Sequence, residues 1–309
     1  MYNLVGTGLN QLPTNSMLGG MAYQSPDHTS IKDLDLKNLS QINSEIADTA
    51  VDIFVYDTRK DSDGGAWRKR TQHTSWYNET LNTATRGARR EFPAVAVIVA
   101  EDAKLVIYDG DDPDLPMWMV INRSGITISS IFALNGNLII GMSNNAMDDI
   151  RFISDLYAYR YSDFLKVAYG AIVNRGGVGT FIATQLTPTG TGIVNVAVND
   201  VAMTVLPNAP IDDATGLPIP TIAVATAGGV SVIKDDGNVF DLNIVNRAYS
   251  SVDFTSDGLI FAVENPGGVN YDLLRYFEIL SADTDNSNAP ATYGPSSTPA
   301  LFPSNTKGN

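Results

Sequence analysis

Short apolar runs alternate with turn residues along most of the chain. The apolar run at residues 94–99 is followed by the turn Glu101-Asp102 and a second run at 104–108. Farther along, Asn135-Gly136 separates two more apolar runs. An Asn-Gly pair supplies the positive φ that a tight hairpin turn requires. The pattern therefore predicts antiparallel hairpins rather than helices for most of residues 51–280.

Four stretches of the chain repeat one order: a strand, a turn with Gly or acidic residues, a strand, a polar gap and a further strand. They cover residues 94–120, 130–152, 222–242 and 252–279. Meanders repeated around an axis build β-propellers. We therefore expect an all-β fold of propeller-like antiparallel meanders, with a β-sandwich as the alternative. At about 40–45 residues per blade, about five or six blades would fit after Val51. With fewer blades, another chain or residues beyond Asn309 would complete the ring.

The two ends of the chain differ from this β region. Residues 1–50 combine a polar leader that carries scattered apolar residues with a helical spacing over residues 31–46. This indicates an extended arm, either mobile or ordered by a neighbouring subunit, and a short amphipathic helix for attachment. Residues 281–309 are rich in Asp, Asn, Ser and Pro and are expected to form a linker or tail. The intervening domain is expected to span residues 51–280.

Two segments inside the β region interrupt its pattern. Residues 71–90 are the least strand-like, and His73, Trp76, Tyr77 and Leu81 could line one side of a short helix laid across the sheet. The loop at residues 207–220 is rich in Pro, Asp and Gly, and its length favours a functional or partner-facing role.

Composition narrows the possible functions. The formal net charge of −14 does not favour general nucleic-acid binding, which needs Lys and Arg against phosphates. Cysteine is absent, so disulfides, zinc-thiolate sites and thiol nucleophiles are excluded. The sequence has no apolar run near the ~20 residues that span a bilayer. The start of the sequence lacks a signal-peptide pattern. We therefore expect synthesis in a cytoplasm, without membrane insertion.

No stretch of the sequence predicts catalysis. His28 and His73 are the only histidines and lie far apart, which makes a poor metal site. The acidic turns, such as residues 109–114, do not match a calcium-binding loop and use the default residues of hairpin turns. Gly176-Gly177-Val178-Gly179 lacks the Lys of a phosphate-binding loop. We expect no metal, no cofactor and no enzyme activity.

One cluster stands out in this acidic chain. Eight of the 20 basic residues, together with aromatic residues, fall within residues 59–90. Arg and Trp are favoured in protein interfaces, so the cluster predicts a site that docks on an acidic surface of a neighbouring subunit. A solvated face and nucleic-acid contact are the alternatives. The predicted interface residues are Arg59, Lys60, Trp67, Arg68, Lys69, Arg70, Trp76, Tyr77, Arg86, Arg89 and Arg90.

Three stretches resemble virion structural proteins of marine bacteriophages, notably those of cyanobacteria. They are residues 55–68 (VYDTRKDSDGGAWR), residues 107–120 (IYDGDDPDLPMWMV), and the run from residues 202–210 (AMTVLPNAP) to residues 230–237 (VSVIKDDG). The resemblance covers roughly residues 10–245 and contains no catalytic motif. It implies a tail-associated or fibre-like component, often the N-terminal part of a longer chain that ends in carbohydrate-binding modules. Such a module would be missing here.

The resemblance and the residue patterns together predict a function. We expect a structural, homo-oligomeric protein of the virion tail that contacts other tail proteins and supports host attachment. Contact with a host glycan would come through the missing module. One alternative is a carbohydrate-binding or glycan-degrading head, which clustered exposed aromatics and paired carboxylates would favour. Another is a nozzle at the base of the tail tube, where an acidic lumen would let DNA slide without sticking.

Overall fold

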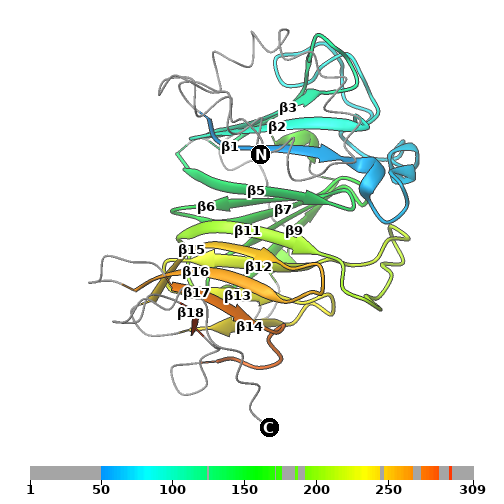
Figure 1. The fold of residues 1–309 in the computed structure, drawn as a ribbon. Helices are drawn as coiled ribbons and strands as arrows, with labels where there is room; N and C mark the ends of the chain where they lie inside the picture. Colours follow the sequence, from blue (N-terminus) through cyan, green and yellow to red (C-terminus); the bar gives the residue numbers. More distant parts are fainter. Residues whose placement is uncertain are drawn as a thin grey trace, which may run out of the picture.

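In the part of the chain that the structure describes, the fold consists of four antiparallel sheets that follow one another in sequence. In the computed structural model, the described residues are 50–123, 125–170, 172–175, 185–186, 192–243, 247–266, 273–284 and 292–293. The predicted arm, the helix at residues 31–46 and the glycine-rich residues 176–179 lie outside this part. Figure 1 shows the sheets as successive layers of nearly parallel ribbons.

The first two sheets contain the N-terminal half of the described chain. Sheet A has the order β1 (Ala50–Asp57), β2 (Val95–Glu101), β3 (Lys104–Asp109) and β4 (Met117–Asn122). Sheet B has the order β10 (Gln185–Leu186), β9 (Leu165–Tyr169), β8 (Leu156–Arg160), β7 (Ala146–Arg151), β6 (Asn137–Met142) and β5 (Ile128–Leu134).

The other two sheets each have four strands. Sheet C has the order β11 (Val198–Thr204), β12 (Thr221–Thr226), β13 (Gly229–Ile233) and β14 (Val239–Leu242). Sheet D has the order β15 (Arg247–Phe254), β16 (Ile260–Pro266), β17 (Leu273–Phe277) and β18 (Thr292–Tyr293).

These sheets confirm the all-β, propeller-like prediction and correct its details. Neighbouring strands pair in sequence order, as a meander requires. The repeats had been placed one strand late in two cases, because β1 and β11 are the first strands of sheets A and C. A long connector separates β1 from β2, which hid their pairing. The described residues form four sheets rather than the five or six blades expected from length.

Each sheet packs on the next through its first strand. β1 packs against β5, β5 against β11, and β11 against β15. One apolar core lies between sheets A and B and is rich in aromatic rings, including Trp67, Trp76 and Trp118. The cores between sheets B and C and between sheets C and D consist mostly of aliphatic side chains. The described sheets therefore form a series held by three successive cores.

The connector between β1 and β2 is irregular, and the helix predicted within residues 71–90 does not form. Only two short 3-10 helices occur in it, η1 (Thr58–Lys60) and η2 (Ala66–Arg70). The Thr71 hydroxyl donates to the carbonyl of Arg68, and the Thr74 hydroxyl donates to that of Thr71. Such local side-chain bonds offer the backbone an alternative to helical pairing. The amphipathic spacing reflects burial of the connector rather than a helix.

The loop at residues 207–220 folds back onto its own chain. Leu217 is buried in the core between sheets A and B. The Asn135 side chain donates to the carbonyl of Pro218, and Arg70 donates to that of Thr215. The loop thus ties sheet C to the first two sheets, while much of it, including Ile211 at 57%, is exposed, so a partner-facing role stays a prediction. Among the described residues, no helix has the length and apolar character needed to cross a bilayer.

Candidate subunit-contact site

The tryptophans of the predicted interface lie inside the chain. Trp67 and Trp76 are completely buried. The Trp67 indole donates to Asp61 at 2.7 Å, and the Trp76 indole donates to the carbonyl of Phe152 at 2.9 Å. A buried indole needs such a partner, and both partners belong to the same molecule. These two residues hold sheets A and B together and present no surface to a neighbouring subunit.

Arg86 is also completely buried. Its guanidinium donates to the carbonyls of Trp118 and Arg90 and lies 4.4 Å from the centre of the Trp118 ring. Burial lowers the pKa of Arg86 to about 10, and the carboxylate of Glu79 partly opposes this effect. Arg86 therefore fastens the connector to β4 from within.

Three further arginines of the cluster bind groups of their own chain. Arg68 donates to the carbonyl of Phe92 at 3.0 Å. Arg89 reaches both Asp109 and Asp111, at 2.7 and 2.5 Å. Arg90 donates to the carbonyl of Tyr77, whose ring packs edge-on against Trp76. A connector without strands leaves backbone carbonyls unpaired, and these guanidinium groups satisfy several of them.

The ion pair between Glu79 and Arg175 was missed by the sequence interpretation. Arg175 is 1% exposed and donates to both carboxylate oxygens of Glu79, at 2.7 and 2.8 Å. It also donates to the carbonyls of Val120 and Thr85. The partners are 96 residues apart in sequence, so no local pattern could have joined them.

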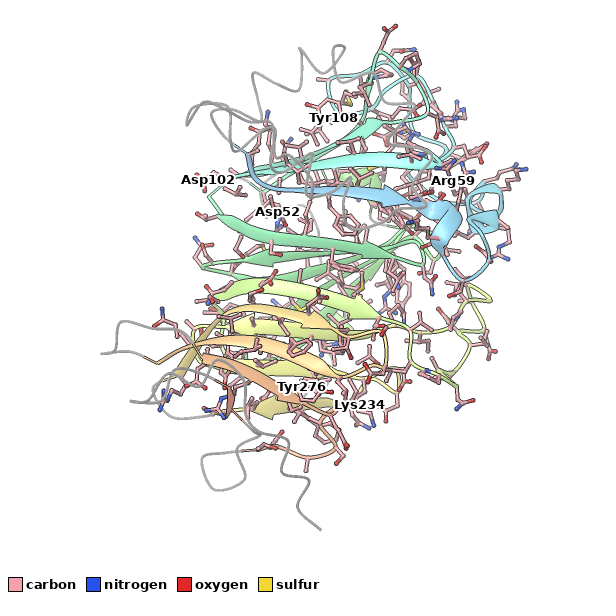
Figure 2. The ribbon with its side chains drawn as sticks, in the orientation of Figure 1. Asp52, Arg59, Asp102, Tyr108, Lys234 and Tyr276 are labelled. Carbon is pink, nitrogen blue, oxygen red and sulfur yellow. The ribbon has the colours of Figure 1, made fainter. Side chains whose placement is uncertain are left out.

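The remaining cations of the cluster form an exposed surface, which we call the basic rim. It consists of Arg59 and Lys60 in η1 and of Lys69 and Arg70 in η2, all exposed. Arg59 pairs with Asp57, and Arg70 pairs with Asp63. Figure 2 shows Arg59 projecting at one side of the molecule. Within the predicted interface, these four side chains are the best placed to meet a partner.

Asp61 joins the connector to sheet B. One carboxylate oxygen accepts the Tyr56 hydroxyl at 2.6 Å and the Trp67 indole, and the other accepts the amide of Asn135 at 2.8 Å. The turn Asn135-Gly136 is held here because the Gly136 amide donates to the Tyr56 hydroxyl. Burial raises the pKa of Asp61 to about 6. The predicted hairpin turn is therefore also a docking point between sheets A and B.

A second polar network links the first strands of the four sheets. Asp52, Ser130, Asp200 and Ser251 occupy equivalent positions, each directly after an irregularity in strand pairing. Asp200 accepts the hydroxyls of Ser130 and Ser251, each at 2.8 Å. Asp52 accepts the amide that follows Ser130, and Asp200 accepts the amide that follows Ser251. Aligning the four repeats at these short polar residues, each followed by Ile or Val, could have revealed the network.

A group of aromatic rings lies at the turn between β8 and β9. Tyr159, Tyr161 and Phe164 are half-buried, with Tyr161 and Phe164 stacked at 5.3 Å. Lys166 lies 4.8 Å from the centre of the Phe164 ring, and the Tyr159 hydroxyl donates to Asn145. This group was not singled out in the sequence, where its members resemble ordinary strand residues.

Acidic and histidine side chains were the groups in the sequence that could have suggested a metal or catalytic site. Asp111 accepts the amides of Ala94 and Val95, so the acidic turn after β3 fastens the start of β2. His73 is exposed, and His28 lies outside the described residues. In the part of the chain that the structure describes, no three acidic or histidine side chains gather closely enough to suggest a metal site.

Several solved structures resemble this chain distantly. No family model and no curated protein matches the chain. A Raptor structure from Chaetomium thermophilum matches 65% of this chain and 20% of its own, at 14% identity and a TM-score of 0.34. A KlHsv2 variant matches 61% of this chain and 62% of its own, at 11% identity and a TM-score of 0.31. The designed protein Ika8 matches 64% of this chain and 61% of its own, at 9% identity and a TM-score of 0.32. These values establish no family.

Proposed function

We propose that this chain is a structural component of a bacteriophage virion tail. It would serve as a tail fibre or tail-associated platform that assembles with other tail proteins and with itself and supports host attachment. The resemblance of three sequence stretches to phage virion proteins suggests that the particle is a phage virion. The supporting observation in the structure is that Trp67, Trp76 and Arg86 are buried within the chain, whereas the basic rim is exposed.

The buried part of the cluster suits a platform because it makes sheets A and B one rigid unit. Trp76 and Arg86 bond groups on other segments. Trp67 bonds Asp61 within the connector and packs in the core between sheets A and B. Arg175, which lies outside the cluster, bonds Glu79 of the connector. A rigid unit loses little conformational entropy when it assembles. The basic rim then supplies exposed cations that can meet an acidic neighbour, and opposite charges across an interface favour the correct partner. The arm at residues 1–50 remains a proposed second attachment.

Purified particles test this proposal. Quantitative mass spectrometry and immunogold labelling of virions from a phage that encodes the chain should find it at the tail in fixed stoichiometry. Particles assembled with Lys60→Glu plus Lys69→Glu should contain less of it. A chain that is abundant in infected cells but missing from purified virions would overturn the proposal.

The aromatic group at the β8–β9 turn favours a second candidate, a glycan-binding surface. Tyr and Phe rings stack on the apolar faces of sugars, and Asn145 and Lys166 add hydrogen-bonding groups beside them. Binding to a glycan array should be lost in Phe164→Ala and kept in Tyr169→Ala, since Tyr169 is exposed outside this group. Equal binding by both variants would contradict this candidate. The nozzle alternative remains a prediction of the sequence.

A further inference from the structure

The outward faces of the first and last sheets, A and D, differ in how completely they are buried. On sheet A, the face turned away from sheet B carries apolar residues that are already buried, with Val97 3% and Val99 0% exposed. On sheet D, the face turned towards sheet C is buried through Val252 and Ala262. The opposite face, which we call the outer face of sheet D, is not closed in this way.

Strand alternation defines the outer face of sheet D. Residues next to the buried Val252, Ala262 and Phe277 point the other way, and the register brings them together. Phe261 pairs with Tyr276, with ring centres 4.9 Å apart, and Val263 pairs with Leu274, which is 40% exposed. Within the series, each described apolar face is covered by the neighbouring sheet. The outer face of sheet D also carries apolar side chains but has no such sheet on it, so it resembles a surface that contacts another molecule.

Carboxylates flank this apolar patch. Asp253 lies opposite Phe261 in the strand register, and Glu278 comes directly after the end of β17, two residues beyond Tyr276. Both are exposed. Apolar centres with charged margins are typical of protein interfaces, and acidic margins select a basic partner.

We propose that the outer face of sheet D binds the basic rim of a second copy of this chain. The rim offers four exposed cations on two adjoining short helices, and their charge is opposite to that of Asp253 and Glu278; Arg59 and Arg70 also pair with carboxylates of their own chain. A chain of net charge −14 repels its own copies unless complementary surfaces meet. The inference rests on the proposed assembly role, and it names the partner and the surface that the rim meets.

The geometry makes this contact head to tail. Figure 2 shows Arg59 and Tyr276 on different parts of the molecule, one beside sheet A and one on sheet D. A contact between different surfaces is heterologous, and its repetition produces either a closed ring or an open filament. Each copy then uses its rim on one neighbour and its sheet D on the other.

Charge reversal tests the contact in the full-length chain. Sedimentation velocity over a range of protein and salt concentrations should show self-association that weakens with salt. Lys60→Glu plus Lys69→Glu should weaken it about tenfold or more, and Glu278→Lys should do the same. Mixing these two variants should restore association, because the acidic rim of one meets the altered sheet D of the other. Asp102→Lys, an exposed reversal on the β2–β3 turn, is the matched control and should change little.

Any one of three results would overturn the proposed contact. The wild-type chain could stay monomeric, its association could survive both charge reversals, or the mixture of the two variants could fail to associate. If the chain is found in virions but is monomeric in sedimentation, this contact is wrong and the tail role stands. If it self-associates as described but is missing from virions, the contact stands and the tail role fails.

Discussion

Two regions of the molecule, the β1–β2 connector and sheet D, differ in the regularity of their backbone and in the burial of their side chains. The connector has only two short 3-10 helices, yet its tryptophans and Arg86 are buried and hydrogen-bonded. Sheet D is made of regular strands, yet one of its faces keeps Leu274 and half-buried rings in contact with solvent. Regularity of backbone and completeness of packing are therefore separate properties in this molecule. The irregular region provides the fastening, and the regular one provides a surface.

Truncating one large aromatic side chain in each region should give the largest difference. Trp67→Ala should lower the free energy of unfolding by about 4 kcal/mol, because it opens a cavity and removes a donor to buried Asp61. Tyr276→Ala on sheet D should cost about 1 kcal/mol, since its ring is only partly buried. Urea unfolding of both variants measures this. Equal losses would contradict the contrast between the two regions.

Removing a charge inside the connector network should have the next largest effect. Arg175→Met leaves Glu79 without its bidentate partner and should lower the free energy of unfolding by about 3 kcal/mol. Arg70→Gln is the matched control, because its side chain is 48% exposed and its partner Asp63 is not fully buried, and exposed pairs contribute less than about 1 kcal/mol. If Arg175→Met unfolds at the same urea concentration as the control, the buried pair does not fasten the connector.

Acid should stabilise the sheet A–sheet B region relative to neutral pH. Asp148 in β7 is completely buried, pairs with Arg123 at 2.9 Å and accepts the Tyr157 hydroxyl. Burial raises the pKa of both Asp61 and Asp148 from 3.8 to about 6. The contribution of each to stability is fully present below about pH 4 and is lost as the pH rises through about 6. Asp148→Asn resembles the protonated acid, so its stability relative to wild type should improve between pH 4 and pH 7. A constant difference in urea midpoint across that range would show that the pKa of Asp148 is not raised.

The network along the first strands should show the smallest of these effects. Ser251→Ala removes one hydrogen bond to Asp200 and should cost about 1 kcal/mol. Ser250→Ala is the neighbouring control, since Ser250 is exposed. Urea unfolding of the two variants decides this. A loss no larger than that of the control would mean that the Asp200 bonds do not stabilise the junction of sheets C and D.

The sequence predicted the strands well because hairpin signals are local. Asn135-Gly136 lies between β5 and β6 as expected, and the turn predicted at Glu101-Asp102 lies one residue later, at Asp102-Ala103 between β2 and β3. The sequence failed where partners are distant. Arg86 and Arg175 look like surface charges in sequence, and only the fold shows that they bind carbonyls and a carboxylate inside the chain. Trp67 and Trp76 were expected at a subunit contact, because aromatic residues beside arginines are typical of both interfaces and cores.

Hydrogen exchange of the isolated chain tests the central claim most directly, namely that the connector is an internal fastening. The amides of Asp61, Thr74 and Gly87 donate to backbone carbonyls of the chain, and the account predicts that they exchange about as slowly as those of β2 and β3. Exchange of residues 58–94 at the rate of an open loop, with β2 and β3 protected, would contradict it.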